Sequence, residues 1–185
     1  MSKRLFVSID LEGLADEITA VQECFEGASG LNFVKPEQAH VTLKFLGDTD
    51  PDRLTALTEE LAAAVEESGV TPFEAHFGDL GAFPSEEYIT VVWVGVRKGG
   101  EAMIDLHEAI EDRTVAMGFD PEDHEFTPHV TVARMDHAGG KEQVQRVLRE
   151  ADPTVGVLDV TDVRLTESIL TDDGPEYQTL ESFEL

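Results

Sequence analysis

Two short segments of this chain repeat one another at a separation of about half its length. Residues 40–43 read His-Val-Thr-Leu and residues 129–132 read His-Val-Thr-Val, and the two histidines lie 89 residues apart in a chain of 185. Apolar residues alternate with the histidine and threonine, which is the pattern of a strand with one buried face. A strand motif repeated at this spacing predicts two similar lobes, each of which places one histidine in a shared cleft.

The rest of the sequence predicts an α+β fold with mainly antiparallel sheets. Apolar residues at helical spacing predict helices within residues 10–27 and over residues 51–68, 101–117 and 141–150. Strands are predicted at residues 4–9, 31–35, 40–46, 73–80, 88–96, 129–135, 155–160, 163–170 and 177–183. Because helices and strands do not alternate regularly, antiparallel pairing is favoured. Residues 91–94 are apolar on both faces, which predicts a central strand.

Length and composition indicate one globular domain over residues 1–185, built of two lobes. Hydrophobic residues make up 41% of the chain, and no apolar run approaches the roughly 20 residues that span a bilayer. The first residues enter a strand pattern directly, without the apolar region of a signal peptide. The single cysteine, Cys24, cannot form an internal disulfide. We therefore expect a cytoplasmic protein without membrane association, and we expect it to be a monomer.

The charge is strongly unbalanced. The chain has 39 acidic and 13 basic residues, which gives a net charge of −26, and the acidic residues are spread along its length. This distribution favours adaptation to a salt-rich cytoplasm, because the Debye length is only about 3 Å at 1 M salt and repulsion between carboxylates is screened. An acidic partner-binding surface is the alternative. Adaptation to salt predicts weaker folding at low salt.

The repeated motifs place pairs of polar side chains together. Residues i and i+2 of a strand point to the same face. His40 therefore shares a face with Thr42, and His129 shares a face with Thr131. If the two strands face each other across a groove, the groove contains two imidazoles and two hydroxyls.

Two basic residues follow the motifs. Lys44 extends the row of His40, whereas Arg134 has the opposite parity to His129. Arg134 therefore reaches the groove only through a bulge, a twist or the end of its strand. Both residues are candidates for contact with an anion.

Two imidazoles suit an in-line displacement at phosphorus. One takes a proton from the attacking oxygen and the other protonates the departing oxygen, and an unperturbed pKa of about 6.5 allows both protonation states near neutral pH. The threonine hydroxyls would donate to the equatorial oxygens, and Lys44 or Arg134 would offset the developing charge. This chemistry requires no metal and no cofactor.

A zinc site is the weaker alternative. Catalytic zinc usually has three protein ligands, and no third histidine or cysteine has suitable local spacing. His76, His107, His124 and His137 lack the motif. His107 lies near the buried stripe of a predicted helix, which indicates packing, while His124 and His137 fall in acidic or glycine-rich loops.

The motifs and their surroundings resemble those of the 2H phosphoesterases, and within them the RNA 2′,3′-cyclic phosphodiesterases, also called 2′-5′ RNA ligases. The segments that carry the resemblance are LFVSIDL (5–11), VKPEQAHVTLKFLGD (34–48), GAFPS (81–85), VVWVGV (91–96), FTPHVTVAR (126–134) and ESILTDDGPEYQTL (167–180). They cover nearly the whole chain. The resemblance implies a bilobal fold with two mainly antiparallel sheets, pseudo-twofold symmetry around a central cleft, and helices on the outer faces.

The resemblance also implies an activity. The family opens a terminal 2′,3′-cyclic phosphate on RNA, for instance on tRNA halves, to a 2′-phosphate without metal, and reversible 2′-5′ ligation is a related reaction. By position, His129 is implied as the general base on water and His40 as the general acid to the departing 3′ oxygen. Thr42 and Thr131 match the threonines of the two motifs, and Arg134 matches the arginine that closes the second.

The chain departs from the family pattern at three positions. The family often has Arg-Trp before the first motif and an arginine before the central strand, where this chain has Asn32-Phe33 and Thr90. Together with the net charge, this implies local recognition of the cyclic phosphate and one or two stacked bases. Phe45 and Phe126 are candidates for stacking, although core packing is the expected role of each.

Two other functions stay open on the sequence alone. One is hydrolysis of another small cyclic phosphodiester, such as an ADP-ribose cyclic phosphate. The other is a non-catalytic module that binds a 2′-phosphorylated nucleotide without turnover. The intact double motif argues against the second.

Overall fold

The computed structural model describes residues 1–185. Its strands are β1 (Lys3–Asp10), β2 (Leu31–Phe33), β3 (His40–Thr49), β4 (Phe73–Pro84), β5 (Ile89–Lys98), β6 (His129–Met135), β7 (Thr154–Val160), β8 (Asp162–Thr171) and β9 (Gly174–Glu184). Its α-helices are α1 (Ala15–Glu23), α2 (Leu54–Ser68), α3 (Gly100–Ala116) and α4 (Lys141–Glu150). Short 3-10 turns lie at Pro36–Gln38, Pro51–Arg53 and Ala138–Gly140. The predicted helices and strands are therefore all present.

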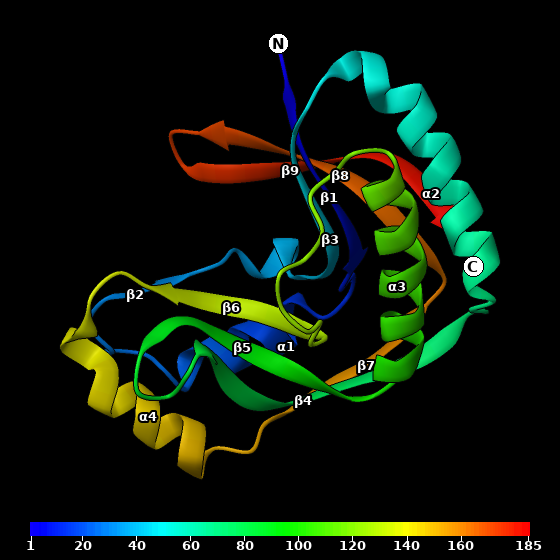
Figure 1. Cartoon of the computed structure of the whole chain (residues 1–185). Helices are drawn as coiled ribbons and strands as arrows, with labels where there is room; N and C mark the ends of the chain where they lie inside the picture. Colours follow the sequence, from blue (N-terminus) through cyan, green and yellow to red (C-terminus); the bar gives the residue numbers. More distant parts are fainter.

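The strands form one curled sheet (Figure 1) in the order β7-β4-β5-β6-β3-β1-β8-β9, with β2 paired to β6. Every pair of neighbours is antiparallel, which confirms the predicted α+β class. The two motif strands, β3 and β6, meet at the centre through a single residue pair, Val41 and Val130. The two predicted sheets are thus halves of one continuous sheet that is narrow at the junction between them.

The order of strands is symmetric about this junction. On one side β6 is followed by β5, β4 and β7, and on the other β3 is followed by β1, β8 and β9. The helices cross between the halves: α1 follows β1 but packs against β6 and β7, and α3 follows β5 but packs against β3 and α2. This exchange ties the halves together around the motif strands.

The face of the motif strands opposite the histidines belongs to the core. Val41, Leu43, Val130 and Val132 are each at most 1% exposed. Their burial fixes the register of the strands, because a slip by one residue would move these side chains to the other face. The orientation of each histidine therefore follows from the buried apolar residues that alternate with the polar residues of its own strand.

Local signals in the sequence set the boundaries of several elements. The Asp50 side chain accepts a hydrogen bond from the backbone N–H of Asp52 at 2.9 Å, as expected of an N-cap. A 3-10 turn precedes α2 there, and Gly69 ends α2 with a φ of 70°. The strand β4 extends to Pro84, beyond the predicted end at residue 80. None of the helices combines the length and the apolar character needed to cross a membrane.

Candidate active site

His40 and His129 come from opposite halves of the sheet and lie on neighbouring strands. Val41 and Val130 pair directly, and both are buried on the core side. The residues next to them in each strand therefore point to the opposite face. The two rings are close enough that the charge of His40 lowers the pKa of His129. The structure thus brings together the two histidines predicted from the repeat.

The two imidazoles are held by the same local geometry. The Nδ1 atom of His40 lies 2.8 Å from the carbonyl oxygen of Gln38, and Nδ1 of His129 lies 2.6 Å from the carbonyl oxygen of Thr127. A carbonyl oxygen only accepts hydrogen bonds, so Nδ1 of each ring is the donor. Each Nε2 has no partner within the protein and is therefore available to a ligand, as base or as acid.

The environment lowers the pKa of both histidines. Burial is the largest cause for each, because it disfavours the charged ring. For His40, the hydrogen bond to Gln38 and the charge of Asp10 oppose this shift, and the charge of Arg134 adds to it. For His129, the charges of His40 and Arg134 also lower the pKa. Without a bound anion, the neutral form of each ring is therefore more favoured than it is in a free histidine.

Aromatic rings surround His40. The ring of Phe6 stacks on it at a centroid distance of 4.8 Å, and the ring of Tyr177 meets it edge-on at 5.3 Å. Burial raises the pKa of Tyr177, so its hydroxyl remains a donor at neutral pH. A cavity of about 100 Å³ lies beside this cluster, lined by Phe6, Asp10, Glu37, Gln38, Ala39, Thr166, Tyr177 and Thr179.

Aromatic rings also surround His129. Phe83 meets its ring edge-on at 4.8 Å, and Trp93 lies 6.0 Å away. The Trp93 ring occupies the space that a Cβ at Gly81 would need, since that Cβ would lie 2.1 Å from the ring. The buried Nε1 of Trp93 has no hydrogen-bond partner. Both histidines are thus partly shielded from water, which strengthens electrostatic interactions at the site.

A β-bulge follows each histidine at the same place in its strand. Along β3, Leu43 is skipped in the pairing with β1, and along β6, Val132 is skipped in the pairing with β5. In consequence Leu43 and Lys44 are both buried, as are Val132 and Ala133. Each bulge adds one residue and reverses the alternation of side chains beyond it.

The bulge in β6 turns Arg134 toward the histidines. Its side chain is exposed, and its charge lowers the pKa of His40, His129 and Tyr177. Arg134 forms no ion pair in the structure. Its partner in the register of β2 is the uncharged Asn32. Of the three routes that the sequence left open for Arg134, a bulge, a twist or the end of the strand, the structure has the bulge.

The bulge in β3 turns Lys44 away from the histidines. Lys44 is only 1% exposed, and its Nζ donates to Glu111 Oε2 at 3.0 Å and to the carbonyl oxygen of Asp120 at 2.6 Å. Simple alternation predicts Lys44 in the same row as His40, and this prediction is wrong. The structure instead places its ammonium between α3 and the following loop, where it reaches no ligand bound at the histidines.

The two motif threonines occupy equivalent positions. Thr42 and Thr131 are half-buried and share the face of the adjacent histidine, since each lies two residues along its strand and before the bulge. Neither hydroxyl forms a hydrogen bond to another side chain. Both are therefore free to donate to an oxygen bound between the imidazoles.

The other histidines serve other roles. His107 is 7% exposed, its Nδ1 lies 2.6 Å from the carbonyl oxygen of Leu43, and its ring stacks on Phe126 at 4.2 Å. This confirms packing for His107 and for Phe126, whereas core packing was wrong for Phe45, which is 47% exposed. His124 lies beside Asp123 on an exposed acidic loop, and His137 accepts a hydrogen bond from the backbone of Gly139.

Phe6 and Tyr177, the aromatic residues beside His40, were not predicted from the sequence. Leu5, Val7 and Ile9 form the buried row of β1, whereas Phe6 lies on the opposite, more polar face. An aromatic residue within a polar row is the signal that would have indicated a second packed surface there. Tyr177 carried a similar signal, because it lies in a polar terminal hairpin.

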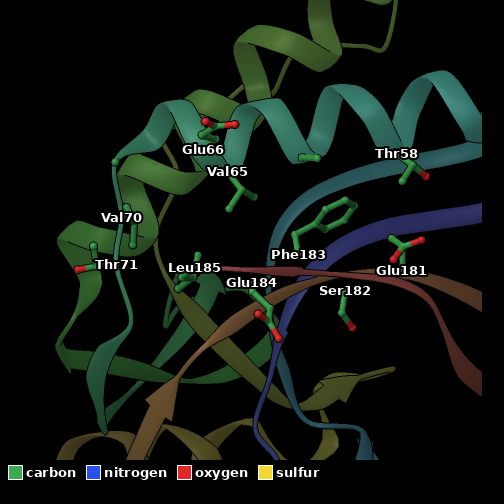
Figure 2. A pocket seen from close by; sticks show the side chains of 12 residues that line it. Thr58, Val65, Glu66, Val70, Thr71, Glu181, Ser182, Phe183, Glu184 and Leu185 are labelled. Atoms are coloured by element: carbon green, nitrogen blue, oxygen red, sulfur yellow. The ribbon is translucent and has the colours of Figure 1, made fainter.

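A larger groove lies away from the histidines. It has a volume of about 790 Å³ and runs between α2 and the end of β9 (Figure 2). Its lining includes the carboxylates Glu66, Glu181 and Glu184 but no basic residue and no histidine. Such a lining repels a phosphate, so the catalytic site of a phosphoesterase does not lie there.

Known proteins are similar to this chain in sequence and in fold. The family model described as the 2′-5′ RNA ligase superfamily matches residues 11–169. The RNA 2′,3′-cyclic phosphodiesterase of Methanothermobacter thermautotrophicus is 35% identical over 188 residues, covering 100% of both chains. The protein of the same name from Aeropyrum pernix is 38% identical over 148 residues, covering 80% of this chain and 82% of its own. The crystal structure of E. coli LigT complexed with 3′-AMP has the same fold, with a TM-score of 0.81 at 23% identity over 100% and 99% of the two chains.

The fold and the paired histidines define a 2H phosphoesterase. Within that class, this chain belongs to the 2′-5′ RNA ligase superfamily.

Proposed function

We propose that this protein hydrolyses the terminal 2′,3′-cyclic phosphate of RNA to a 2′-phosphate. The observation that carries the proposal is the matched pair of imidazoles, each with Nδ1 bound to a backbone carbonyl and Nε2 free on one face of the sheet. The names of the relatives from Methanothermobacter thermautotrophicus and Aeropyrum pernix support the same substrate.

In the proposed reaction, His129 is the general base and His40 is the general acid. Nε2 of neutral His129 takes a proton from water as the water oxygen forms a bond to phosphorus. The bond from phosphorus to the 3′ oxygen breaks, and protonated His40 gives its Nε2 proton to that oxygen. The products are a 2′-phosphate and a free 3′-hydroxyl, and the pair of imidazoles returns to its starting state when protons exchange with water.

The remaining polar groups of the site would bind the phosphoryl oxygens. Thr42 and Thr131 would each donate a hydrogen bond from one half of the sheet. The guanidinium of Arg134 would offset the charge that develops on the equatorial oxygens. We leave Lys44 out of this set, because its ammonium is bound to Glu111 and Asp120. No step requires a metal ion.

The reaction can be tested by product analysis on an RNA that ends in a 2′,3′-cyclic phosphate, in strong salt with EDTA. We expect a 2′-phosphate and a 3′-hydroxyl, at a rate that EDTA does not change. A 3′-phosphate product would contradict the assignment of the 3′ oxygen as leaving group. Turnover of ADP-ribose cyclic phosphate but not of RNA would identify the smaller phosphodiester as the substrate, and binding of a 2′-nucleotide without turnover of either would identify a binding module.

We infer that kcat/KM for the cyclic phosphate peaks below about pH 6.5. The reaction needs one neutral and one protonated imidazole, and the pKa of each is lowered from the ordinary value of about 6.5.

Replacement of Arg134 by Gln removes a positive charge that favours the neutral rings. Both pKa values therefore rise, and the pH profile moves toward higher pH.

The variant Arg134→Gln should also lower kcat/KM by about 10–100-fold, because a charged hydrogen bond to the phosphate is lost. The matched control is Arg146→Gln, which makes the same change in net charge on an exposed position of α4. Profiles measured at one salt concentration should coincide for the control and the wild type. An unchanged or acid-shifted profile for Arg134→Gln would contradict the placement of this guanidinium beside the imidazoles.

We propose further that residues 1–185 work as a single bilobal domain and a monomer in a salt-rich cytoplasm. RNA fragments with cyclic phosphate ends, such as tRNA halves, would be its substrates. A 5′-hydroxyl in place of water would give a 2′-5′ linkage at the same site, although hydrolysis is favoured in water.

The adaptation to salt predicts that the unfolding temperature rises as KCl increases from about 0.1 M to 2 M. The Debye length falls from about 10 Å at 0.1 M salt to about 3 Å at 1 M salt, which weakens repulsion among the surface carboxylates. Differential scanning calorimetry measures this effect, and a series in sucrose controls for general solute exclusion. An unfolding temperature that is independent of KCl would contradict the interpretation.

A further inference from the structure

Seven of the 13 basic residues of this acidic chain form ion pairs with carboxylates. The ones that form ion pairs are Lys3, Lys44, Arg97, Lys98, Arg113, Arg149 and Arg164. Arg53 donates to the carbonyl oxygen of Met117 and lies over the ring of Phe119. Arg4, Lys35, Arg134, Lys141 and Arg146 form no ion pair and no side-chain hydrogen bond, and of these only Arg4 and Arg134 shift the pKa of a group at the site. An unpaired guanidinium in such surroundings is available to an external anion.

Arg4 lies on the same face of the sheet as the histidines. It is two residues from Phe6 along β1, and the ring of Phe6 stacks on His40. In the register of the sheet, Arg4 is opposite Ser168 of β8, which is in turn opposite Tyr177 of β9. Directly opposed residues of neighbouring strands share a face. The charge of Arg4 accordingly reaches the Tyr177 hydroxyl.

The two halves of the site differ at one symmetric position. Phe45 and Arg134 each lie five residues after the histidine of their motif, beyond equivalent bulges. The guanidinium carbon of Arg4 lies over the half-exposed ring of Phe45, 5.0 Å from its centroid. Arg4 therefore brings a guanidinium to the place in the first half that Arg134 occupies in the second. The contact with Phe45 also holds the guanidinium in position.

We propose that Arg4, positioned by Phe45, binds the phosphate on the 5′ side of the terminal nucleoside, one nucleotide upstream of the cyclic phosphate. This inference depends on the proposed reaction and names the part of the substrate that the histidines do not contact. Two residues of a strand span roughly 7 Å, so Arg4 lies one short step beyond the Phe6 and His40 stack. A planar guanidinium suits a phosphodiester, which it binds through two parallel hydrogen bonds.

The proposal predicts that the enzyme prefers substrates with a 5′-phosphate, and this preference can be measured with the wild type and two variants of Arg4. The substrates are adenosine 2′,3′-cyclic phosphate, the same nucleotide with a 5′-phosphate, and the dinucleotide ApA ending in a cyclic phosphate. We expect kcat/KM to be about 10-fold higher or more for the second and third than for the first. Arg4→Gln should abolish this preference and leave kcat/KM for the first substrate within about twofold of wild type. Arg4→Lys, which keeps a point charge, should retain part of it.

The control is Arg146→Gln, which changes the net charge equally and should keep the full preference. An equal loss on all three substrates in Arg4→Gln would show that Arg4 supports the fold or the chemistry, and would overturn the proposal. So would an unchanged preference, or a preference for the dinucleotide that the 5′-phosphate alone does not produce. If wild-type enzyme turns over none of the three substrates, the proposed reaction itself has failed.

Discussion

Replacement of either His40 or His129 by alanine is expected to lower kcat/KM for a 2′,3′-cyclic phosphate by about 10²–10⁴-fold. This is the usual contribution of a positioned acid or base to a proton transfer. Each ring has a distinct task in the proposed reaction, so loss of one leaves the other without a complementary partner. The double variant should therefore fall little further than either single variant, because residues that act as a unit are not additive.

The control for this experiment is His76→Ala. His76 is a partly exposed histidine of β4, and its Nε2 lies 2.6 Å from Oε1 of Glu74; the strand β5 separates β4 from the motif strand β6. Its loss should leave kcat/KM unchanged. Thermal unfolding of each variant verifies the fold, since the His40 ring packs on Phe6. Retention of most activity by folded His40→Ala and His129→Ala would rule out the two-histidine mechanism.

The second large effect concerns stability. Replacement of Lys44 by alanine is expected to reduce the free energy of unfolding by about 3 kcal/mol, because it leaves a largely buried Glu111 without its cation. Lys44 is 1% exposed and Glu111 is 19% exposed by side chain. The same ammonium also binds the carbonyl oxygen of Asp120, so its loss removes a link between α3 and the loop that leads to His129.

A neutral replacement of the pair separates charge from packing. The double variant Lys44→Met, Glu111→Gln removes both charges and retains most of the volume, so it should lose less stability than Lys44→Ala. Chemical denaturation provides the free energies of unfolding. For each folded variant, kcat/KM should stay within a few-fold of wild type. A stable double variant with a 100-fold loss of turnover would contradict the exclusion of Lys44 from the residues that bind the phosphate.

The outline of the fold was predictable because it depends on periodic apolar residues. The helices and strands follow from that periodicity, and the antiparallel arrangement follows from their irregular order. The symmetric placement of His40 and His129 was predictable for the same reason, since a repeated strand motif implies a repeated structure. The buried residues Val41 and Val130, each next to a histidine in its strand, fix the face to which the rings point.

The outcomes for Lys44 and Arg134 were not predictable from alternation alone. A bulge shifts the register of the pairing by one residue. No residue type at Leu43 or Val132 marks these positions as bulges in the sequence. The effect of a bulge is to exchange the faces of the residues that directly follow it, which buries Lys44 and brings Arg134 to the histidines. The sequence indicated only that a bulge was one of the ways in which Arg134 could reach the site.

The partners of the histidines depend on contacts that are distant in sequence. Tyr177 meets His40 because β9 lies beside β8, and β8 lies beside β1. The order of strands in the sheet is not encoded in any local pattern. For the same reason, the free guanidinium of Arg4 became visible only once the ion pairs of the other basic residues were known.

The central claim is that both Nε2 atoms contact one phosphate, and histidine NMR tests it most directly. In ¹⁵N-labelled protein titrated with adenosine 2′-phosphate, the Nε2 resonances of His40 and His129 should shift together along one saturation curve with a single ligand bound. Those of His107 and His76 should not shift. If only one of the motif histidines responds at saturation, or neither does, the two imidazoles do not share a phosphate and the account is contradicted.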